Sequence, residues 1–253
     1  MELGLRDKVV LVTGGSRGIG SAICESFARE GASVAFNYLN SKEKAEDLAA
    51  YLQTTYGTKA LAFSADMSRE SDILAMIAAV EQSAGSIDVL VNNAAVCPSG
   101  PITSYTTEVW EKTFATNVTG MFVATREVVS RLQARQAGGA IVNIASQAAF
   151  RGSTTGHLPY DSSKGAMVSF TVGLAREVSA SGIRVNAVAP GLVRTEMVAK
   201  TWEERKERYL QNIPIHRIAE PREIADIVVF LASERGSYIT GATIDASGGM
   251  MMR

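Results

Sequence analysis

A tyrosine and a lysine stand four positions apart in the stretch LPYDSSK, at Tyr160 and Lys164. Residues at this spacing share one face of an α-helix, so the two side chains are neighbours if the stretch is helical. An unperturbed tyrosine loses its proton at about pH 10, and a nearby ammonium stabilises the phenolate and lowers that pKa. The pair is therefore a candidate for proton exchange near neutral pH. Because the same spacing also occurs by chance on ordinary amphipathic helices, the rest of the chain has to supply a site around it.

A glycine-rich turn follows the first apolar run of the chain, in the stretch TGGSRGIG, where Gly14, Gly18 and Gly20 are spaced G-x-x-x-G-x-G. Such a turn lets the backbone approach a phosphate closely and directs free N–H groups and a helix dipole at its charge. Tight turns alone would also require glycines. The position between the first expected strand and helix of an alternating chain favours a nucleotide site.

The second apolar run ends in FNYLNSKEK, which has no carboxylate at its tip. Chains that bind NAD normally place an Asp or Glu there for the ribose 2′-hydroxyl. Here Asn37, Tyr38, Ser41 and Lys42 follow instead, and Arg17 of the glycine loop is close enough in the expected fold to reach the same corner. A missing acid with available cations suits a 2′-phosphate, which predicts NADP(H) in preference to NAD(H). The alternative is that Lys42 and Arg17 are ordinary solvated charges.

Short apolar runs alternate with longer amphipathic stretches along the whole chain. The expected strands are 8–13, 33–38, 59–65, 87–93, 139–145, 183–189 and 242–246. The expected helices are 18–30, 42–56, 69–84, 106–134, 160–180 and 221–233. Val- and Ile-rich strands in strict alternation with helices are typical of a parallel sheet covered on both faces. The pattern predicts one α/β domain over residues 1–253, a Rossmann-like doubly wound sheet of about seven strands. Ligands of such sheets bind beyond the carboxyl ends of the strands.

The overall composition is that of an ordinary globular protein, with 253 residues, 46% hydrophobic and 20% charged, and a net charge of -1. This balance gives no electrostatic footprint for nucleic acid and no polybasic patch for a membrane. No apolar run has the length of a membrane span and no secretory signal is visible, so we expect a cytoplasmic protein. Cys24 and Cys97 fit neither a disulfide framework nor a metal site, and are interpreted as buried free thiols.

Four motifs together resemble those of a known family: TGGSRGIG, NNAA at 92–95, SSK after Tyr160, and PGLVRT at 190–195. In this order and spacing the chain resembles the short-chain dehydrogenase/reductase family over nearly all of its length. Within the family it is similar to bacterial 3-oxoacyl-[acyl-carrier-protein] reductases and to related carbonyl reductases and sugar dehydrogenases. In place of the glycine that usually ends the NNAG motif, this chain has Ala95.

The resemblance implies that Asn117, Ser146, Tyr160 and Lys164 are catalytic. Tyr160 would give a proton to a carbonyl oxygen that Ser146 hydrogen-bonds, as general acid catalysis of carbonyl reduction requires. Lys164 would tune Tyr160 and hold the nicotinamide ribose, and Asn117 would anchor a chain of waters. The residues expected to bind the cofactor are Gly14, Ser16, Arg17, Gly18, Ile19, Gly20, Asn37, Tyr38, Ser41, Asp66, Met67, Asn93, Ala94, Ala95, Tyr160, Lys164, Pro190, Gly191, Val193 and Thr195.

Two segments are expected to shape the choice of substrate, namely 147–159 and a helical lid over 193–217. The first is one residue longer than the resemblance to acyl-carrier reductases implies, which weakens that assignment. An acidic carrier protein would need a basic docking surface, and the candidates, which are equally well interpreted as solvated charges, are Arg126, Arg131, Arg135, Arg151 and Arg194. His157 and Asp161 flank Tyr160 without a required role, and His157 is expected at the mouth of the pocket.

Three functions stay open at this point. The first is NADPH-dependent reduction of a ketone to an alcohol, the ketone being a 3-oxoacyl thioester, which an acyl-carrier protein could present, or a similar carbonyl compound. The second is dehydrogenation of a sugar or secondary alcohol, and the third is a non-catalytic NADP-binding subunit, against which the complete catalytic set argues. The resemblance also implies a homotetramer through 106–134, 160–180 and 221–246. The many apolar residues of 165–178 and the methionines of GGMMMR at 248–253 support such burial.

Overall fold

The alternating strands form one parallel sheet in the part of the chain that the structure describes. This computed structural model describes residues 2–153 and 155–252, with the backbone alone at 197, 200, 201 and 203–205. Thr154, within the segment expected to shape substrate choice, and Arg253, at the end of the tail, lie outside the described residues.

The sheet has the strand order β3-β2-β1-β4-β5-β6-β7, and every neighbouring pair is parallel. The strands are β1 (Val9–Val12), β2 (Ser33–Tyr38), β3 (Ala60–Ser64), β4 (Val89–Asn92), β5 (Gly139–Ile144), β6 (Ile183–Pro190) and β7 (Thr243–Ala246). Strand order reverses between β1 and β4, where Val10 pairs with Val34 on one side and with Val89 on the other. The predicted Rossmann-like doubly wound fold is confirmed.

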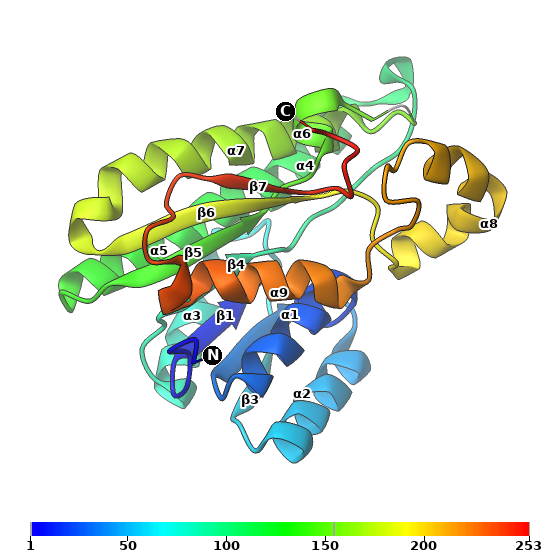
Figure 1. Cartoon of the computed structure of the whole chain (residues 1–253). Coiled ribbons are helices and arrows are strands. Elements are labelled where there is room, and N and C mark those ends of the chain that lie inside the picture. Colours follow the sequence, from blue (N-terminus) through cyan, green and yellow to red (C-terminus); the bar gives the residue numbers. More distant parts are fainter. Residues whose placement is uncertain (1, 154, 253) are drawn as a thin grey trace.

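Helices cover both faces of this sheet (Figure 1). They are α1 (Gly18–Arg29), α2 (Lys42–Tyr56), α3 (Glu70–Ala84), α4 (Thr107–Phe114), α5 (Gly120–Ala134), α6 (Ala148–Arg151), α7 (Leu158–Val178), α8 (Glu196–Gln211) and α9 (Pro221–Ala232), with the short turns η1 (Ile102–Ser104), η2 (Ala115–Thr119), η3 (Ser179–Ser181) and η4 (Glu234–Gly236). One apolar layer joins α1, α2 and α9 to the sheet, and the other joins α3, α5 and α7. Helix α8 projects beyond these layers (Figure 1).

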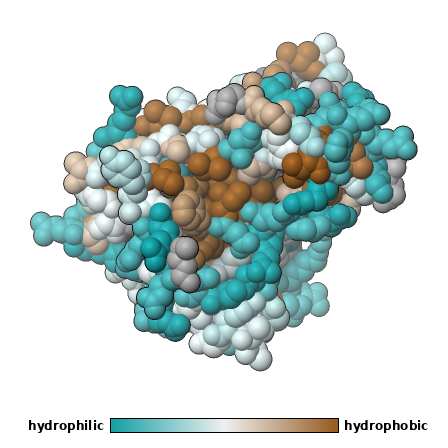
Figure 2. Space-filling view, viewed as in Figure 1, coloured by the Kyte–Doolittle hydropathy of each residue, from teal (hydrophilic) through white to brown (hydrophobic). Residues whose placement is uncertain are grey.

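Each layer is closed by large side chains that are removed from water, such as Phe27 and Phe36 on one face and Leu90 and Leu132 on the other. Burial of a side chain of this size contributes about 1.5–3 kcal/mol relative to exposure, so the two layers hold the strand ends in fixed positions. No helix among the described residues has both the length and the apolar character needed to cross a membrane. In the view of Figure 1, apolar surface gathers over α9 and the strands beside it (Figure 2).

Two helices differ from the sequence-based expectation. The stretch 107–134 is helical throughout but not α-helical throughout, because the π-helical turn η2 lies between α4 and α5. Such turns insert an extra residue and are frequent at functional sites, and η2 contains Asn117. Helix α7 begins at Leu158 rather than 160, because Pro159 fits the first helical turn, where a backbone N–H has no partner in any case.

Candidate active site

A cleft with a volume of about 790 Å³ lies at the carboxyl ends of the strands, where the strand order reverses. Its lining includes every residue predicted to bind the cofactor, together with Ser146, Tyr160 and Lys164. Asn117 is the predicted site residue that does not line it. Lining residues that the motifs did not single out include Leu39, Val96, Cys97, Thr116, Glu196 and Val198. The structure therefore brings the predicted residues to one place, and their individual roles stay predictions.

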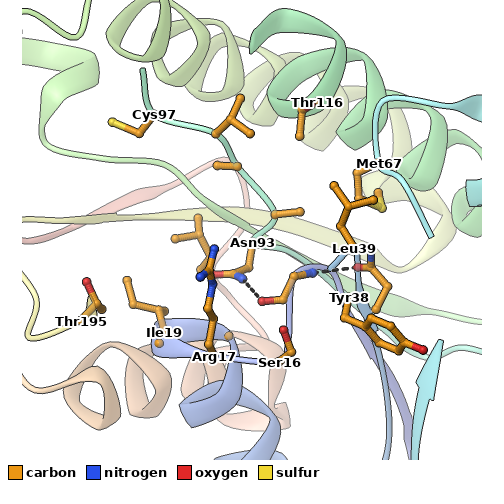
Figure 3. Close-up of a pocket in the computed structure, with 18 of the residues that line it drawn as sticks. Ser16, Arg17, Ile19, Tyr38, Leu39, Met67, Asn93, Cys97, Thr116 and Thr195 are labelled. Atoms are coloured by element: carbon orange, nitrogen blue, oxygen red, sulfur yellow. Dashed lines mark hydrogen bonds between the residues drawn. The ribbon is translucent and has the colours of Figure 1, made fainter. Parts of the chain in front are cut away.

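The glycine loop is held in a shape that only glycine adopts easily. Gly14 has φ +65°, in the left-handed region, and a Cβ on Gly20 would collide with the carbonyl oxygen of Gly14. Two asparagines hydrogen-bond the loop, and Figure 3 labels one of them, Asn93. The N–H of Gly14 donates to Oδ1 of Asn37 at 2.8 Å, and Nδ2 of Asn93 donates to the carbonyl of Gly14 at 2.9 Å. Both contacts bring the ends of neighbouring strands onto the loop.

The side chain of Asn37 has partners within the protein that its place in the sequence did not indicate. Its side chain is 2% exposed, and its Nδ2 also donates to the carbonyl of Ala65 at 2.8 Å. With both amide atoms used inside the protein, Asn37 shapes the glycine loop, and the neighbouring Tyr38 and Ser41 present the more accessible lining at this end of the cleft. The partners of Asn37 are distant in sequence, so no local motif could have assigned this role.

The start of α1 suits an anionic ligand. The helix begins at Gly18 directly after Arg17, with no side chain capping its first N–H groups and no acidic residue in its first turn. Free N–H groups and the helix dipole at this point favour negative charge. The glycine cradle, the uncapped helix start and the size of the cleft fit the diphosphate of a dinucleotide. The residues that would hold it are Ser16, Arg17, Gly18 and Ile19, which line this part of the cleft.

The expected adenine end is shaped by Asp66 and Met67. Oδ1 of Asp66 accepts from the N–H of Ser68 at 2.8 Å and from its hydroxyl at 2.7 Å, and the backbone hydrogen bond is the main reason that the pKa of Asp66 is lowered. A Cβ on Gly120 would collide with the carbonyl oxygen of Met67, so α5 packs directly on this wall of the cleft. Ala95, which stands where the family motif has glycine, is exposed in the cleft, so its methyl group is accommodated without a clash.

Two cations, Arg17 and Lys44, lie near the tip of β2, whereas the sequence predicted Arg17 and Lys42. Lys42 pairs with Glu46 on the next turn of α2 at 3.7 Å and does not line the cleft. Lys44 instead extends toward α8, where its Nζ lies 2.6 Å from Oε1 of Glu196. Arg17 reaches the other oxygen of the same carboxylate at 3.6 Å.

Tyr160 and Lys164 lie on the first two turns of α7, side by side as their spacing predicted. Lys164 is 2% exposed, its Nζ donates to the carbonyl of Ile144 at 2.5 Å, and the same atom lies 5.5 Å from the centre of the Tyr160 ring. Ser146 follows β5 and hydrogen-bonds Tyr160. Its Oγ also accepts from the N–H of Ala148 at 3.1 Å, which fixes the hydroxyl at the carboxyl end of the sheet.

The pKa values of this pair differ from the sequence-based expectation. Burial raises the pKa of Tyr160, and the hydrogen bond with Ser146 acts in the opposite direction without overcoming it. Burial also lowers the pKa of Lys164 to about 8. The ammonium is directed at the carbonyl of Ile144, and withdrawal from water disfavours both charged forms. In this structure the expected lowering of the tyrosine pKa is therefore absent.

Asn117 is completely buried behind the cleft wall. Its Oδ1 accepts from the N–H of Val96 at 2.8 Å, while its Nδ2 donates to the carbonyl of Val96 at 3.0 Å and to Oγ of Ser163 at 2.9 Å. Ser163 precedes Lys164, and Val96 precedes the cleft residue Cys97. The side chain of Asn117 thus ties the strand-end loop after β4 to helix α7, at the level of the tyrosine and lysine.

The residues beside Tyr160 connect the loops around the cleft mouth. Nδ1 of His157 lies 2.9 Å from the carbonyl oxygen of Pro98, and because a carbonyl can only accept, this nitrogen donates. Asp161 accepts from the N–H and the hydroxyl of Ser153, both at 2.7 Å, and so anchors the segment expected to shape substrate choice. These contacts give both residues structural partners that the sequence did not indicate.

The interpretation of both cysteines as buried thiols holds for Cys24 and is wrong for Cys97. Cys97 is only partly buried and lines the cleft, with its Sγ 3.5 Å from Nδ1 of His157. Burial raises the pKa of Cys97 to about 11, so the thiol stays protonated at neutral pH. Among the described residues, no three metal-ligating side chains of the His, Cys, Asp or Glu type come together.

Comparisons with known proteins agree with this geometry. A family model described as enoyl-(acyl carrier protein) reductase matches residues 14–251. The 3-oxoacyl-[acyl-carrier-protein] reductase FabG of Aquifex aeolicus (strain VF5) is 38% identical over 250 residues, which cover 99% of this chain and 100% of that protein. A short-chain dehydrogenase/reductase from Serratia marcescens BCRC 10948 has a solved structure with a TM-score of 0.91 and 37% identity, covering 98% of this chain and 99% of that one. The chain belongs to the short-chain dehydrogenase/reductase family.

Membership of this short-chain dehydrogenase/reductase family makes the protein an oxidoreductase of the NAD(P)-dependent type. Another solved member, L-sorbose reductase from Gluconobacter frateurii in complex with NADPH and L-sorbose, matches with a TM-score of 0.93 and 33% identity over 100% of both chains. The similarity extends over the glycine loop, the Tyr160 helix and α8, so the whole cleft falls within the shared fold.

Proposed function

We propose that the protein is an NADPH-dependent reductase that converts a ketone to an alcohol, with Tyr160 as the proton donor. The observation that carries the proposal is the convergence of Ser146, Tyr160 and Lys164 on the cleft that also contains the glycine loop. A non-catalytic subunit would not need a buried lysine beside a buried tyrosine, because withdrawing a lysine from water is costly. When bound, the nicotinamide supplies the hydride that carbonyl reduction requires.

The side chains have distinct parts in this chemistry. The Tyr160 hydroxyl keeps its proton at neutral pH because burial raises its pKa, so it is in the form that an acid needs. Ser146 holds the tyrosine and would donate a hydrogen bond to the substrate oxygen as negative charge grows there. Lys164, whose pKa is lowered to about 8, carries its charge at neutral pH and stabilises that same charge. Asn117 would position Tyr160 and Lys164 through its hydrogen bond to Ser163, without itself lining the cleft.

Replacing the hydroxyl that is proposed to donate the proton tests the mechanism. Tyr160→Phe should lower turnover by about 10²–10⁴-fold, the usual contribution of general acid catalysis, while the Kd for NADPH stays within about twofold. Tyr51→Phe is the matched control, because Tyr51 lies on the exposed side of α2 and should leave both values unchanged. Near-normal turnover in Tyr160→Phe would refute the assigned role, and loss of NADPH binding would point to a structural one.

We propose NADP(H) as the preferred cofactor. The tip of β2 presents Tyr38, Leu39, Asn40 and Ser41 to the cleft, together with Arg17, and none of these is the carboxylate that normally accepts from the ribose 2′-hydroxyl of NAD. The NADPH named in the structure of the sorbose reductase supports the same choice. Kd values for NADPH and NADH, measured by quenching of protein fluorescence, test it, and a tighter Kd for NADH would overturn it.

For the substrate, we favour a small free ketone over a thioester on acyl-carrier protein. The arginines considered as a basic docking surface are engaged within the chain: Arg126 with Glu70, Arg131 with Glu81 and Glu127, Arg135 with Asp88, Arg151 with the carbonyl of Met250, and Arg194 with Glu220. Four of the five therefore face a carboxylate that reduces their attraction for an acidic partner. The names of FabG relatives keep the carrier-bound thioester as the alternative.

A matched pair of substrates separates these possibilities. The acetoacetyl group can be presented on acyl-carrier protein or on N-acetylcysteamine, which carries the same thioester without the protein. If the carrier lowers KM by less than about threefold, docking contributes little, and a decrease of a hundredfold or more would establish the carrier as partner. A panel of ketoses and secondary alcohols, assayed with NADPH or NADP⁺, tests the second candidate function, which the sorbose reductase similarity favours.

We propose two further features of the chain as a whole. Helix α8 with its flanking loops, residues 193–217, acts as the lid of one domain, since Val193, Thr195 and Val198 line the cleft from this segment. Self-association covers the apolar surface over α9 and the edge strand β7 (Figure 2). Phe230 belongs to α9 and is 42% exposed. Within the methionine-rich tail, Met251 is buried against its own chain and Met252 is 71% exposed, which leaves Met252 for a partner. Sedimentation of Phe230→Asp tests the association, because a charge there should shift a tetramer toward smaller species.

A further inference from the structure

The carboxylate of Glu196 connects α8 with two cations at the end of the cleft formed by the glycine loop and the tip of β2. Glu196 is the first residue of α8, and its two oxygens face Lys44 of α2 at 2.6 Å and Arg17 of the glycine loop at 3.6 Å. Arg17 and Glu196 both line the cleft, and Lys44 follows the lining residues Asn40 and Ser41. The contact therefore joins two segments at the cleft that are distant in sequence, since Lys44 and Glu196 are 152 positions apart.

The same two cations stand where the proposed cofactor needs positive charge. In dinucleotide-binding folds the tip of the second strand receives the adenosine ribose, and an arginine nearby accommodates a 2′-phosphate. Arg17 lies between Thr195 on the lid side and Tyr38 on the β2 side in Figure 3. Glu196 is ionised across the neutral range, because Lys44 above all lowers its pKa. An anion of this chain thus occupies the cations that a phosphate of the ligand would use.

The strengths of the two interactions decide which anion is bound. The side chains of Arg17, Lys44 and Glu196 are 65%, 57% and 61% exposed, and ion pairs in such surroundings are weak and screened by salt. A phosphate monoester carries about -1.5 to -2 charges and three acceptor oxygens, and arginine binds it in a bidentate manner. A 2′-phosphate therefore displaces the carboxylate, whereas a 2′-hydroxyl has no charge with which to compete.

We propose that Glu196 is an internal competitor of the 2′-phosphate, which latches the start of α8 onto Arg17 and Lys44 and is released when NADP(H) binds. Lys44 thereby becomes a residue that determines cofactor specificity together with Arg17. The inference rests on the proposed NADP(H) preference and extends it to the lid. NADH, which lacks the phosphate, leaves the latch in place, so cofactor identity is transmitted to the position of the segment that lines the substrate end.

Binding measurements without turnover test this proposal. The probes are adenosine 2′,5′-bisphosphate and adenosine 5′-monophosphate, which differ only in the 2′-phosphate. In Glu196→Gln the bisphosphate should bind about three- to tenfold more tightly than in the unmodified protein, and the monophosphate should bind equally well in both. Glu46→Gln is the matched control, since it removes the same charge from α2, where Glu46 pairs with Lys42 outside the cleft. It should change neither Kd by more than about 1.5-fold.

Two further measurements separate the latch from a general charge effect. Lys44→Met should weaken binding of the bisphosphate. In the Lys44→Met background, Glu196→Gln should lose most of its effect on bisphosphate affinity, because Lys44 and Glu196 then no longer interact. Hydrogen exchange of the N–H groups at the start of α8 should accelerate with the bisphosphate and not with the monophosphate.

Several results would overturn the proposal. The first is weaker binding of the bisphosphate by Glu196→Gln, which would mean that Glu196 holds the bound ligand in place. The second is an equal increase in affinity for both probes, and the third is an increase in bisphosphate affinity no larger than that of Glu46→Gln. If neither probe nor NADPH binds the unmodified protein, the proposed function fails as well. If NADPH binds and supports turnover while Glu196→Gln leaves the probes unchanged, only the latch is refuted.

Discussion

Replacing Asn117 with alanine would remove three hydrogen bonds from a side chain that has no contact with water. Each bond of this kind contributes about 1 kcal/mol net, and the N–H and carbonyl of the partly buried Val96 and the hydroxyl of the buried Ser163 would lose their partner. The free energy of unfolding should therefore fall by about 3–5 kcal/mol. In a chain of this length each kcal/mol corresponds to roughly 2–4 °C, so the Tm should fall by about 6–20 °C.

The same change should also lower the rate, because Asn117 connects Val96 at the cleft wall with Ser163 beside Lys164. A displacement of about 1 Å at the reacting groups can cost about a hundredfold, so we expect kcat to fall by roughly ten- to a hundredfold. Since Asn117 does not line the cleft, the Kd for NADPH should change much less than kcat. Differential scanning fluorimetry, steady-state kinetics and fluorescence titration measure these three quantities.

Asn212→Ala is the control for removing an asparagine side chain. Asn212 is exposed after α8, and among the described residues its side chain makes one hydrogen bond, from Nδ2 to the carbonyl of Arg208 at 2.7 Å. Loss of this side chain should therefore change the stability by no more than about 0.5 kcal/mol. If Asn117→Ala unfolds at the same temperature as Asn212→Ala, the three hydrogen bonds of Asn117 do not stabilise the fold. A fall in Tm with unchanged kcat would show that Asn117 supports stability and does not position the catalytic group.

Two other predictions concern the cofactor side of the cleft. The value of kcat/KM for NADPH should decline as the pH rises through about 8, because Lys164 is charged below its lowered pKa and neutral above it; a profile that is flat from about pH 7 to 9.5 would contradict this assignment. Gly120→Ala should weaken NADPH binding and cost about 1–3 kcal/mol of stability, because the new methyl group collides with the carbonyl of Met67. Gly173→Ala on α7, where a Cβ meets nothing within 4 Å, should be neutral or slightly stabilising, so equal effects of the two changes in a denaturant titration would refute the argument.

The fold could be predicted from the sequence because its signals are local. The runs at 33–38 and 139–145 are apolar over most of their length, and they became β2 and β5 within one residue at each end. Gly14 and Gly18 stand in the first turn between strand and helix, and both adopt the positive φ that glycine permits. The four-residue spacing of Tyr160 and Lys164 likewise placed them on one helix face, as the structure has them.

The site could be predicted only as a set of residues, because their partners come from distant parts of the chain. Asn37 and Asn93 both hold Gly14, across separations of 23 and 79 positions. Glu196 meets Lys44 only because the start of α8 lies beside the cleft, and the prediction named Lys42 in place of Lys44. Periodicity and motif spacing contain no information on such contacts, since they depend on the order of strands in the sheet.

The sequence by itself determined the alternation of strands and helices, the glycine loop and the residue types at the cleft, since each follows from neighbours along the chain. The tertiary structure alone decided which of these groups are removed from water. Burial raises the pKa of Tyr160 and lowers that of Lys164, the reverse of what an exposed helical pair would show for the tyrosine. The physical reason is that a pKa depends on the solvation of the charged form, and solvation is set by everything packed around the group once the sheet and its two helical layers have closed.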